Sequence, residues 1–313
     1  DYVIGNPPFF KLKASDPRLP LYRLEAKNKN TSNICSFFLE KSLRLAKYVA
    51  LVFPKFLLNT PEFSTTRAEL AQKSVDAILD FGEKGFPGIL VETIAIFINN
   101  LAAPANTKVF SLTHRLHLTQ PQAYIFDPEL PYWIIYRNQL FDSVCRKLDF
   151  DVFEVFRDRQ LTNKLLSSSG ELRVLKSRNL SDDGKEILDI PGYDSYISYA
   201  AAKPLSVFQY LDAPNVYLTP NMTYKPRMMK KPPHCVVNGS LAILIPKGGI
   251  VPTEKQLAYF SSEEYRAFYQ IARNFQTRSL NVDACSVFFY GLLRDEAKPA
   301  PEKFDTSVQL FFL

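Results

Sequence analysis

Cysteine, histidine and long apolar runs are scarce in this 313-residue sequence, and each scarcity removes a class of protein. The four cysteines, Cys35, Cys145, Cys235 and Cys285, have no Cys or His neighbour at metal-ligand spacing, so a structural zinc site is not expected. They are typical of reduced thiols in a cytoplasmic protein. No apolar run approaches the roughly 20 residues that span a bilayer, so no membrane segment is expected.

The three histidines, His114, His117 and His234, are too few and too isolated to supply a general base or a metal site. No motif of a divalent-metal nuclease is present, so no metal is expected, and any DNA cleavage would need residues outside this sequence. The sequence also opens on Asp1 without an initiator Met or a signal-type leader, which suggests that it starts inside a longer gene product.

Composition and charge are those of an ordinary globular protein, with 46% hydrophobic and 22% charged residues and enough length for two domains. The formal net charge of +6 and the pI of about 9.0 permit an acidic partner such as nucleic acid without requiring one.

Short apolar runs alternate with helical patterns over residues 1–105, which is typical of a parallel sheet with helices on its faces. This order predicts an α/β domain, with helices at 36–47 and near 65–73 and with strands at 2–5, 48–53, 75–81 and 92–99. The alternation stops in the small, proline-containing segment 101–106, and we place a domain boundary between residues 105 and 106.

The remaining part, 106–313, is richer in aromatic and basic residues and predicts an α+β domain. Its short strand-like runs, at 152–156, 216–218 and 241–245, are separated by Pro, Gly, Asn and Ser turns. Ser261 and Glu264 have capping-box spacing ahead of Tyr265 and Phe268, which predicts a helix there.

The motif Asn6-Pro7-Pro8-Phe9 directly follows the first predicted strand, and the carboxyl end of a strand is where open α/β sheets bind ligands. The Asn6 side-chain oxygen and the Pro7 carbonyl are two acceptors that could hold both protons of an exocyclic amine. Two prolines stiffen the loop, and Phe9 could stack on the ring that carries the amine. The alternative is an ordinary turn after a strand, since Asn and Pro favour turns.

Such a loop suits methyl transfer to an aromatic amine, a poor nucleophile because its lone pair is delocalised. Holding both N–H groups aims that lone pair at an electrophilic methyl group. A base in duplex DNA would have to leave the stack to reach the loop.

Several stretches, taken in order, resemble the second half of the gamma-type DNA adenine-N6 methyltransferases, in which the Asn-Pro-Pro-aromatic motif follows the fourth strand of a Rossmann-like fold. They are residues 1–9, 33–47, 48–58, 67–70, 78–82 and 92–97. The resemblance implies S-adenosylmethionine as methyl donor, with Asn6 and Pro7 holding the adenine amine and Phe9 stacking on the flipped base. It places Phe97 against the other face of the base, although a strand Phe buried in the core is an equal alternative.

The sequence departs from that family in one respect. The glycine-rich cofactor loop and the acidic residue that binds the ribose precede the motif there, and this sequence has nothing before it. The resemblance therefore implies an α/β fold class, the distal half of a Rossmann-like methyltransferase sheet, followed by an α+β target-recognition domain. The S-adenosylmethionine site should be incomplete, and residues 2–5 should form an exposed apolar edge.

The second part resembles the target-recognition region of Eco57I-like restriction-modification methylases in residues 172–179, 217–220, 225–227, 237–240 and 272–281. Basic residues in these stretches and in nearby loops could contact the phosphates or base edges of double-stranded DNA, the alternative for each being a solvated surface charge. They are Arg157, Arg159, Lys164, Arg178, Lys225, Arg227, Lys230, Lys231 and Arg278.

The sequence therefore predicts a site-specific adenine-N6 DNA methyltransferase of a restriction-modification system. Two alternatives stay open: a DNA-binding specificity module without catalysis, and a protein-glutamine methyltransferase, whose enzymes resemble this motif but lack a long domain after the last strand.

Overall fold

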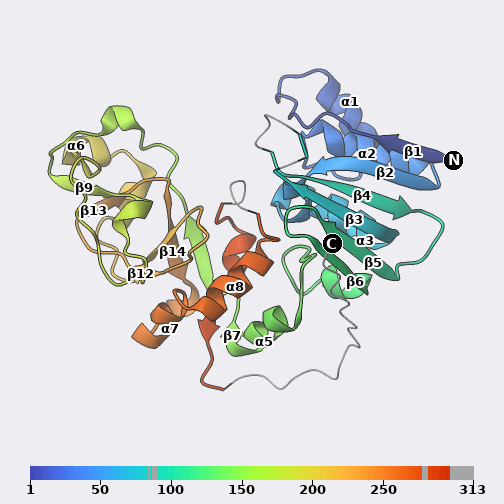
Figure 1. The fold of residues 1–313 in the computed structure, drawn as a ribbon. Helices are drawn as coiled ribbons and strands as arrows, with labels where there is room; N and C mark the ends of the chain where they lie inside the picture. The colour runs from blue at the N-terminus through green and yellow to red at the C-terminus, as the bar shows by residue number, and fades with distance from the viewer. Residues whose placement is uncertain (84, 87–90, 277–280, 297–313) are drawn as a thin grey trace. The chain divides into compact units, whose positions relative to one another are not determined.

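The computed structural model describes residues 1–83, 85–86, 91–276 and 281–296 and divides the chain into two compact units between Asn138 and Gln139 (Figure 1). The predicted boundary between residues 105 and 106 is wrong for the fold. Two further strands, at 106–111 and 116–121, extend the sheet of the first unit, so the proline-containing segment 101–106 is a connection inside that unit.

The first unit is built on a six-stranded mixed sheet of order β1-β2-β4-β3-β5-β6. Strands β1, β2, β3 and β5 run in one direction, and β4 and β6 run in the other, so the predicted parallel sheet is corrected to a mixed one. The strands are β1 (Tyr2–Gly5), β2 (Tyr48–Pro54), β3 (Ser74–Gly82), β4 (Thr93–Asn99), β5 (Asn106–Ser111) and β6 (Leu116–Pro121).

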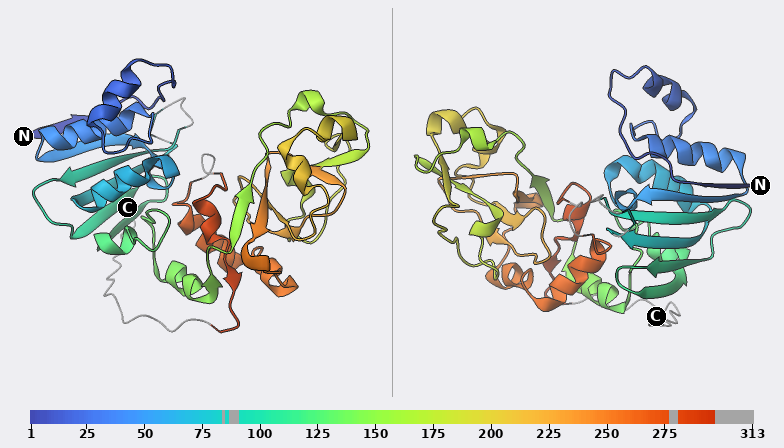
Figure 2. Two further views of the ribbon diagram at one scale, coloured as in Figure 1. Left: turned by 180° about the vertical axis from the view of Figure 1, so that it is seen from behind. Right: turned by 45° about the horizontal axis from the view of Figure 1, so that its top comes forward.

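Helices cover one face of this sheet. Helix α2 packs against β2 and α3 packs against β3, because two successive right-handed crossovers place both helices on the same side (Figure 2, left view). Asn33 caps α2 by accepting a hydrogen bond from the backbone N–H of Cys35. The helices of the unit are α1 (Arg18–Glu25), α2 (Ile34–Leu45), α3 (Ser64–Ala71) and α4 (Gln122–Ile125), with 3₁₀ turns η1 (Lys55–Leu58) and η2 (Pro61–Phe63).

The opposite face carries exposed apolar side chains. Tyr2 and Ile4 on the edge strand β1 are 73% and 81% exposed, and the Tyr2 ring stacks on Tyr48 of β2 with centroids 5.0 Å apart. The α/β class and the exposed apolar edge at residues 2–5 are thus confirmed.

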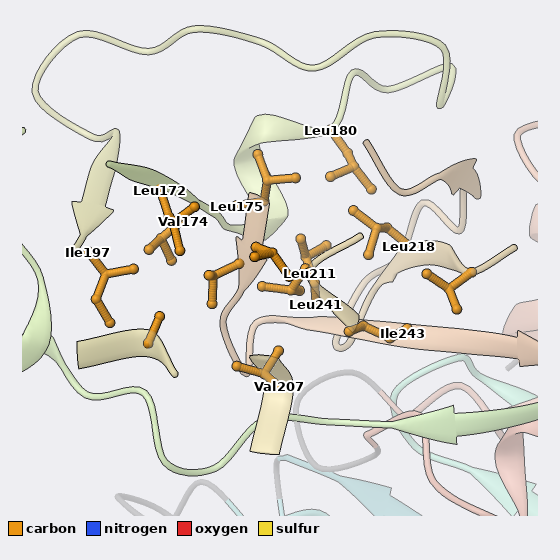
Figure 3. Close-up of a cluster of buried hydrophobic side chains, with 14 residues drawn as sticks. Leu172, Val174, Leu175, Leu180, Ile197, Val207, Leu211, Leu218, Leu241 and Ile243 are labelled. Atoms are coloured by element: carbon orange, nitrogen blue, oxygen red, sulfur yellow. The ribbon is translucent and has the colours of Figure 1, made fainter. Parts of the chain in front are cut away.

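The second unit is α+β, as predicted. An antiparallel sheet of order β12-β11-β14-β8 lies beside a smaller sheet of order β10-β9-β13. Side chains from both sheets share one core, which includes Leu172, Val174, Leu218, Leu241 and Ile243 (Figure 3). The strands are β7 (Leu148–Asp149), β8 (Phe153–Phe156), β9 (Leu172–Leu175), β10 (Ser195–Ile197), β11 (Tyr217–Pro220), β12 (Met229–Lys230), β13 (Cys235–Val237), β14 (Leu241–Pro246) and β15 (Leu292–Leu293).

The helices of this unit include α8, which packs against α5. The predicted helix exists, but its cap is Ser262, whose hydroxyl accepts from the N–H of Tyr265, and not Ser261. The helices are α5 (Gln139–Lys147), α6 (Tyr199–Ala202), α7 (Glu254–Tyr259) and α8 (Glu263–Ala272), and the 3₁₀ turns are η3 (Asn163–Leu165), η4 (Ser177–Asn179), η5 (Ser206–Tyr210), η6 (Lys247–Gly249) and η7 (Ser286–Phe289). No helix in the described part of the chain has both the length and the apolar character needed to cross a bilayer.

Candidate active site and nucleic-acid interface

The loop of residues 6–10 begins where β1 ends, at the carboxyl edge of the first unit's sheet. Pro7 is buried, whereas Asn6 and Pro8 are exposed and Phe9 is half-buried. The motif thus presents a polar side chain to solvent above a proline that is packed into the fold. This is a suitable arrangement for a binding loop at the end of a parallel strand.

Both ends of this loop are fixed by backbone hydrogen bonds. At its start, β1 pairs with β2 up to Gly5 and Leu51. At its end, Lys11 forms an antiparallel bridge with Asn33, in which the N–H of Ile34 donates to the Phe10 carbonyl at 3.1 Å and that of Leu12 to the Ser32 carbonyl at 2.9 Å. Five residues, two of them proline, therefore connect two fixed points, and the loop is preorganised.

Phe97 does not lie at this edge. It is the fifth residue of β4, a strand that begins at the carboxyl edge with Thr93. Phe97 pairs with Ala50 of β2, which in turn pairs with Ile4 of β1. Its side chain is 40% exposed on the face opposite α2 and α3, so it is neither buried in the core nor beside Asn6. The assignment of base stacking to Phe97 is therefore corrected.

The connection between β3 and β4 does lie at the carboxyl edge, and it contains a half-buried aromatic residue, Phe86. Its neighbour Gly85 sits against Thr93, because a Cβ at Gly85 would come within 2.3 Å of the Thr93 hydroxyl oxygen. The sequence prediction missed Phe86 because it sought an aromatic inside a strand. The run Gly82-Glu83-Lys84-Gly85-Phe86, glycine-spaced after a strand, is the signal that could have identified it.

A buried charged cluster lies at the same edge. Lys55, directly after β2, places its ammonium 2.7 Å from Oδ2 of Asp80 on β3 and 3.4 Å from Oε2 of Glu92, and all three side chains are almost fully buried. The Tyr136 hydroxyl donates to the same Asp80 oxygen at 2.5 Å. Burial, followed by the Asp80 charge, raises the pKa of Tyr136 well above its usual value, so Tyr136 stays a hydrogen-bond donor.

In the second unit, three predicted DNA contacts are accessible, two of them in the loop after β8 and Lys164 on the 3₁₀ turn η3. Arg157 follows β8 and is half-buried, and Arg159 and Lys164 are exposed. Burial, and then repulsion from Arg159, lower the pKa of the Arg157 guanidinium. The two arginines therefore contribute positive charge to the same loop, which favours an anionic partner there.

The turn that carries these two arginines is fixed by Asp158. Its carboxylate accepts from the N–H groups of Gln160, at 3.3 Å, and Leu161, at 2.8 Å. Gly239 packs so closely that a Cβ there would come within 2.7 Å of the Asp158 carbonyl oxygen. Arg157 and Arg159 are thus carried by a rigid turn.

Arg178 is exposed and stacks on an aromatic ring, with its guanidinium carbon 4.7 Å from the centroid of Tyr193. The Lys176 ammonium lies 4.2 Å from the same centroid and donates to the Tyr193 carbonyl and the Ser195 hydroxyl. Tyr193 therefore holds the Arg178 fork in one orientation.

Two of the predicted DNA contacts are structural instead. Arg227 is 8% exposed and donates to the carbonyl oxygens of Lys225, Ser177 and Leu180, and Lys231 is 4% exposed and donates to those of Leu211 and Pro232. Both side chains are thus buried against backbone carbonyls, where a phosphate cannot reach them. Both assignments are corrected.

The remaining predicted DNA contacts, Lys225, Lys230 and Arg278, differ in their surroundings. Lys225 is exposed but forms an ion pair with Asp182, at 2.8 Å, and Lys230 is exposed on the short strand β12. Arg278 lies outside the described residues.

The residues that the structure describes do not form an S-adenosylmethionine pocket. None of the eleven glycines belongs to a Gly-x-Gly turn, and β1 is an edge strand of the described sheet, so no neighbouring strand completes a cofactor crevice beside Asn6. Within the described residues, no three His, Cys, Asp or Glu side chains group as metal ligands would.

Comparison with known proteins finds a family that the first part of the chain resembles. Residues 1–86 match the sequence model of the Eco57I restriction-modification methylase family. This part of the chain is therefore similar to restriction-modification methylases. For residues 1–86 the match confirms the predicted resemblance to a restriction-modification methylase, and it ends within the β3–β4 connection of the first unit. No curated protein matches the chain.

One solved structure resembles the fold of this chain well beyond residues 1–86. The type IIL restriction-modification enzyme MmeI, solved in complex with DNA, matches 92% of this chain and 46% of its own, with 11% identity and a TM-score of 0.52. A modification subunit of a putative type I restriction enzyme from Vibrio vulnificus YJ016 matches 36% of this chain and 25% of its own, with 17% identity and a TM-score of 0.31. The M protein of type I restriction enzyme EcoKI matches the same shares, with 20% identity and a TM-score of 0.29. The chain thus spans between about a quarter and a half of these structures.

Proposed function

We propose that the chain is the distal part of a site-specific DNA methyltransferase of a restriction-modification system, which transfers a methyl group from S-adenosylmethionine to N6 of a flipped adenine. The observation that carries the proposal is the loop of residues 6–10, which exposes Asn6 at the carboxyl edge between two fixed ends. The methylase family match over residues 1–86 supports it.

In this proposal, the Asn6 side-chain oxygen and the Pro7 carbonyl accept the two N–H groups of the adenine amine. These two hydrogen bonds would direct the nitrogen lone pair out of the ring plane toward a methyl donor, and the proton that the nitrogen loses after methylation would pass to solvent. Positioning accounts for most of the rate enhancement, because no strong base is needed before the methyl group arrives. Phe9 stacks on one face of the base, and Phe86, not Phe97, is the aromatic residue at the same edge that could contact the other face.

S-Adenosylmethionine supplies an electrophilic sulfonium methyl group. Because the residues present do not complete its pocket, no step of the mechanism is assigned to contacts with it. The second unit recognises double-stranded DNA, with Arg157, Arg159, Lys164 and Arg178 as its best-placed contacts and with Lys225 and Lys230 as further candidates. The fold likeness to a DNA-bound restriction-modification enzyme over 92% of the chain supports this role.

The experiment uses the full-length enzyme with labelled S-adenosylmethionine and duplex DNA, followed by nucleoside analysis. N6-methyladenine in the DNA, lost in Asn6→Ala while DNA binding is retained, supports the proposal. Asn30→Ala is the matched control, because Asn30 is also an exposed asparagine of the first unit and lies outside the motif. Labelled protein with unlabelled DNA would favour the glutamine-methyltransferase alternative, and DNA binding without transfer would favour a specificity module.

A further inference from the structure

We infer that Glu62 is a positioning residue for the loop of residues 6–10, an inference that rests on the proposed function. Glu62 lies on η2, far along the chain from the motif, and its side chain is only 16% exposed. It acts through Lys11 and through residues 31–34, which hold the distal end of the loop.

One carboxylate makes all of these contacts. Oε2 of Glu62 lies 2.6 Å from the Lys11 ammonium. Oε1 accepts from the Thr31 hydroxyl at 3.0 Å and from the N–H of Ser32 at 3.4 Å. Glu62 therefore connects both sides of the Lys11–Asn33 bridge to a third element, and the bridge cannot shift without breaking charge-assisted hydrogen bonds.

Neighbouring hydrogen bonds extend the network of contacts around Glu62. The Thr31 hydroxyl that donates to Glu62 also accepts from the N–H of Asn33, the residue that caps α2. The side-chain amide of Asn28 donates to the backbone carbonyl of Glu62 at 2.8 Å and to the Thr66 hydroxyl at 2.9 Å. These hydrogen bonds join three elements into one rigid assembly: the end of the motif loop, the start of α2 and the turn η2. Such rigidity matters because catalytic groups must be held within about 0.5 Å of their productive positions.

A second ion pair in the same unit provides a matched control. Lys27 and Glu69 lie 2.8 Å apart and are 67% and 13% exposed, whereas Lys11 and Glu62 lie 2.6 Å apart and are 61% and 16% exposed. The Lys27 ammonium pairs with Glu69 on α3, whereas Lys11 of the Lys11–Asn33 bridge pairs with Glu62 on η2. The two ion pairs therefore match in the exposure of their side chains, but only the Lys11–Glu62 pair includes a residue of the Lys11–Asn33 bridge.

The first readout is amide hydrogen exchange in the folded protein. The N–H groups of Leu12 and Ile34 form the bridge and report its opening. In Glu62→Ala their exchange should accelerate by about tenfold, and in Lys11→Met, which removes only the ion pair, by a smaller factor. Exchange at Ile98 in β4 should not change in either variant, nor should any of these amides change in Glu69→Ala. Unchanged exchange at Leu12 and Ile34 in Glu62→Ala, or equal acceleration in Glu69→Ala, would overturn the inference.

The second readout is steady-state methylation of plasmid DNA by the full-length enzyme. A residue that positions the loop should lower kcat by about tenfold in Glu62→Ala and leave KM for DNA within about twofold, because recognition lies in the second unit. Glu69→Ala should retain both parameters. Faster exchange with an unchanged kcat would also overturn the positioning role. If the wild-type enzyme methylates no DNA, the proposed function fails, while the exchange data still decide whether Glu62 anchors the loop.

Discussion

The Lys55 ammonium lies 2.7 Å from Oδ2 of Asp80 in the interior of the first unit, where both side chains are at most 2% exposed. Glu92 approaches the same ammonium, and Tyr136 donates to the same carboxylate. The pair connects the end of β2 to the end of β3, two strands separated in the sheet by β4. It therefore fixes the carboxyl edge on which the proposed active site stands.

Lys55→Met should lower the free energy of unfolding of the first unit by about 3–5 kcal/mol, because it leaves two buried carboxylates without their cation. Denaturant unfolding followed by Trp133 fluorescence measures this directly. Trp133 is the only tryptophan, is 4% exposed and belongs to the first unit, so it reports on this unit alone.

Lys27→Met is the control for this prediction, since its ion pair with Glu69 is mostly exposed on the lysine side and should contribute less than about 1 kcal/mol. A Lys55→Met protein as stable as Lys27→Met would mean that the buried pair is not needed to hold the edge.

Arg227→Ala should destabilise the second unit by about 2–4 kcal/mol, because the carbonyl oxygens of Lys225, Ser177 and Leu180 lose a charged donor in a buried place. Lys225→Ala removes only an exposed ion pair with Asp182 and should cost less than about 1 kcal/mol. Calorimetry of both variants tests the difference. Equal stability of the two proteins would show that Arg227 is not the structural residue that its burial indicates.

The sequence predicted the features that depend on local pattern. The motif after β1, the helix that Asn33 caps and the strands with apolar runs all follow from residue type and spacing. The domain boundary was wrong because a proline-containing turn inside a unit has the same composition as a linker. The mixed direction of the sheet was missed because an apolar run such as Thr93–Asn99 does not encode the direction of its partner.

Side-chain roles were predicted less well, since they depend on what surrounds a residue. Arg227 and Lys230 lie in one basic run, yet the first is buried among carbonyl oxygens and the second is exposed. Glu62 has no motif around it, and its contacts with Lys11 and Thr31 arise only when η2 packs against the start of α2. The base-stacking role of Phe97 came from the family resemblance, whereas the register of β4 places this residue away from the carboxyl edge.

Arg157 and Arg159 offer a test of the nucleic-acid interface by salt dependence. If each contacts a phosphate, each alanine substitution should weaken binding of a fluorescein-labelled mixed-sequence duplex by roughly tenfold and reduce the slope of log affinity against log salt by about 1. Fluorescence anisotropy over a salt titration measures both quantities. Lys247→Ala is the control, because the Lys247 ammonium is partly exposed in the same unit but is paired with Asp151 at 2.6 Å, and it should leave the slope unchanged. A weaker affinity with the slope of the wild-type protein would show that the two arginines support the turn around Asp158 and do not contact phosphates, and an unchanged affinity would remove this loop from the interface.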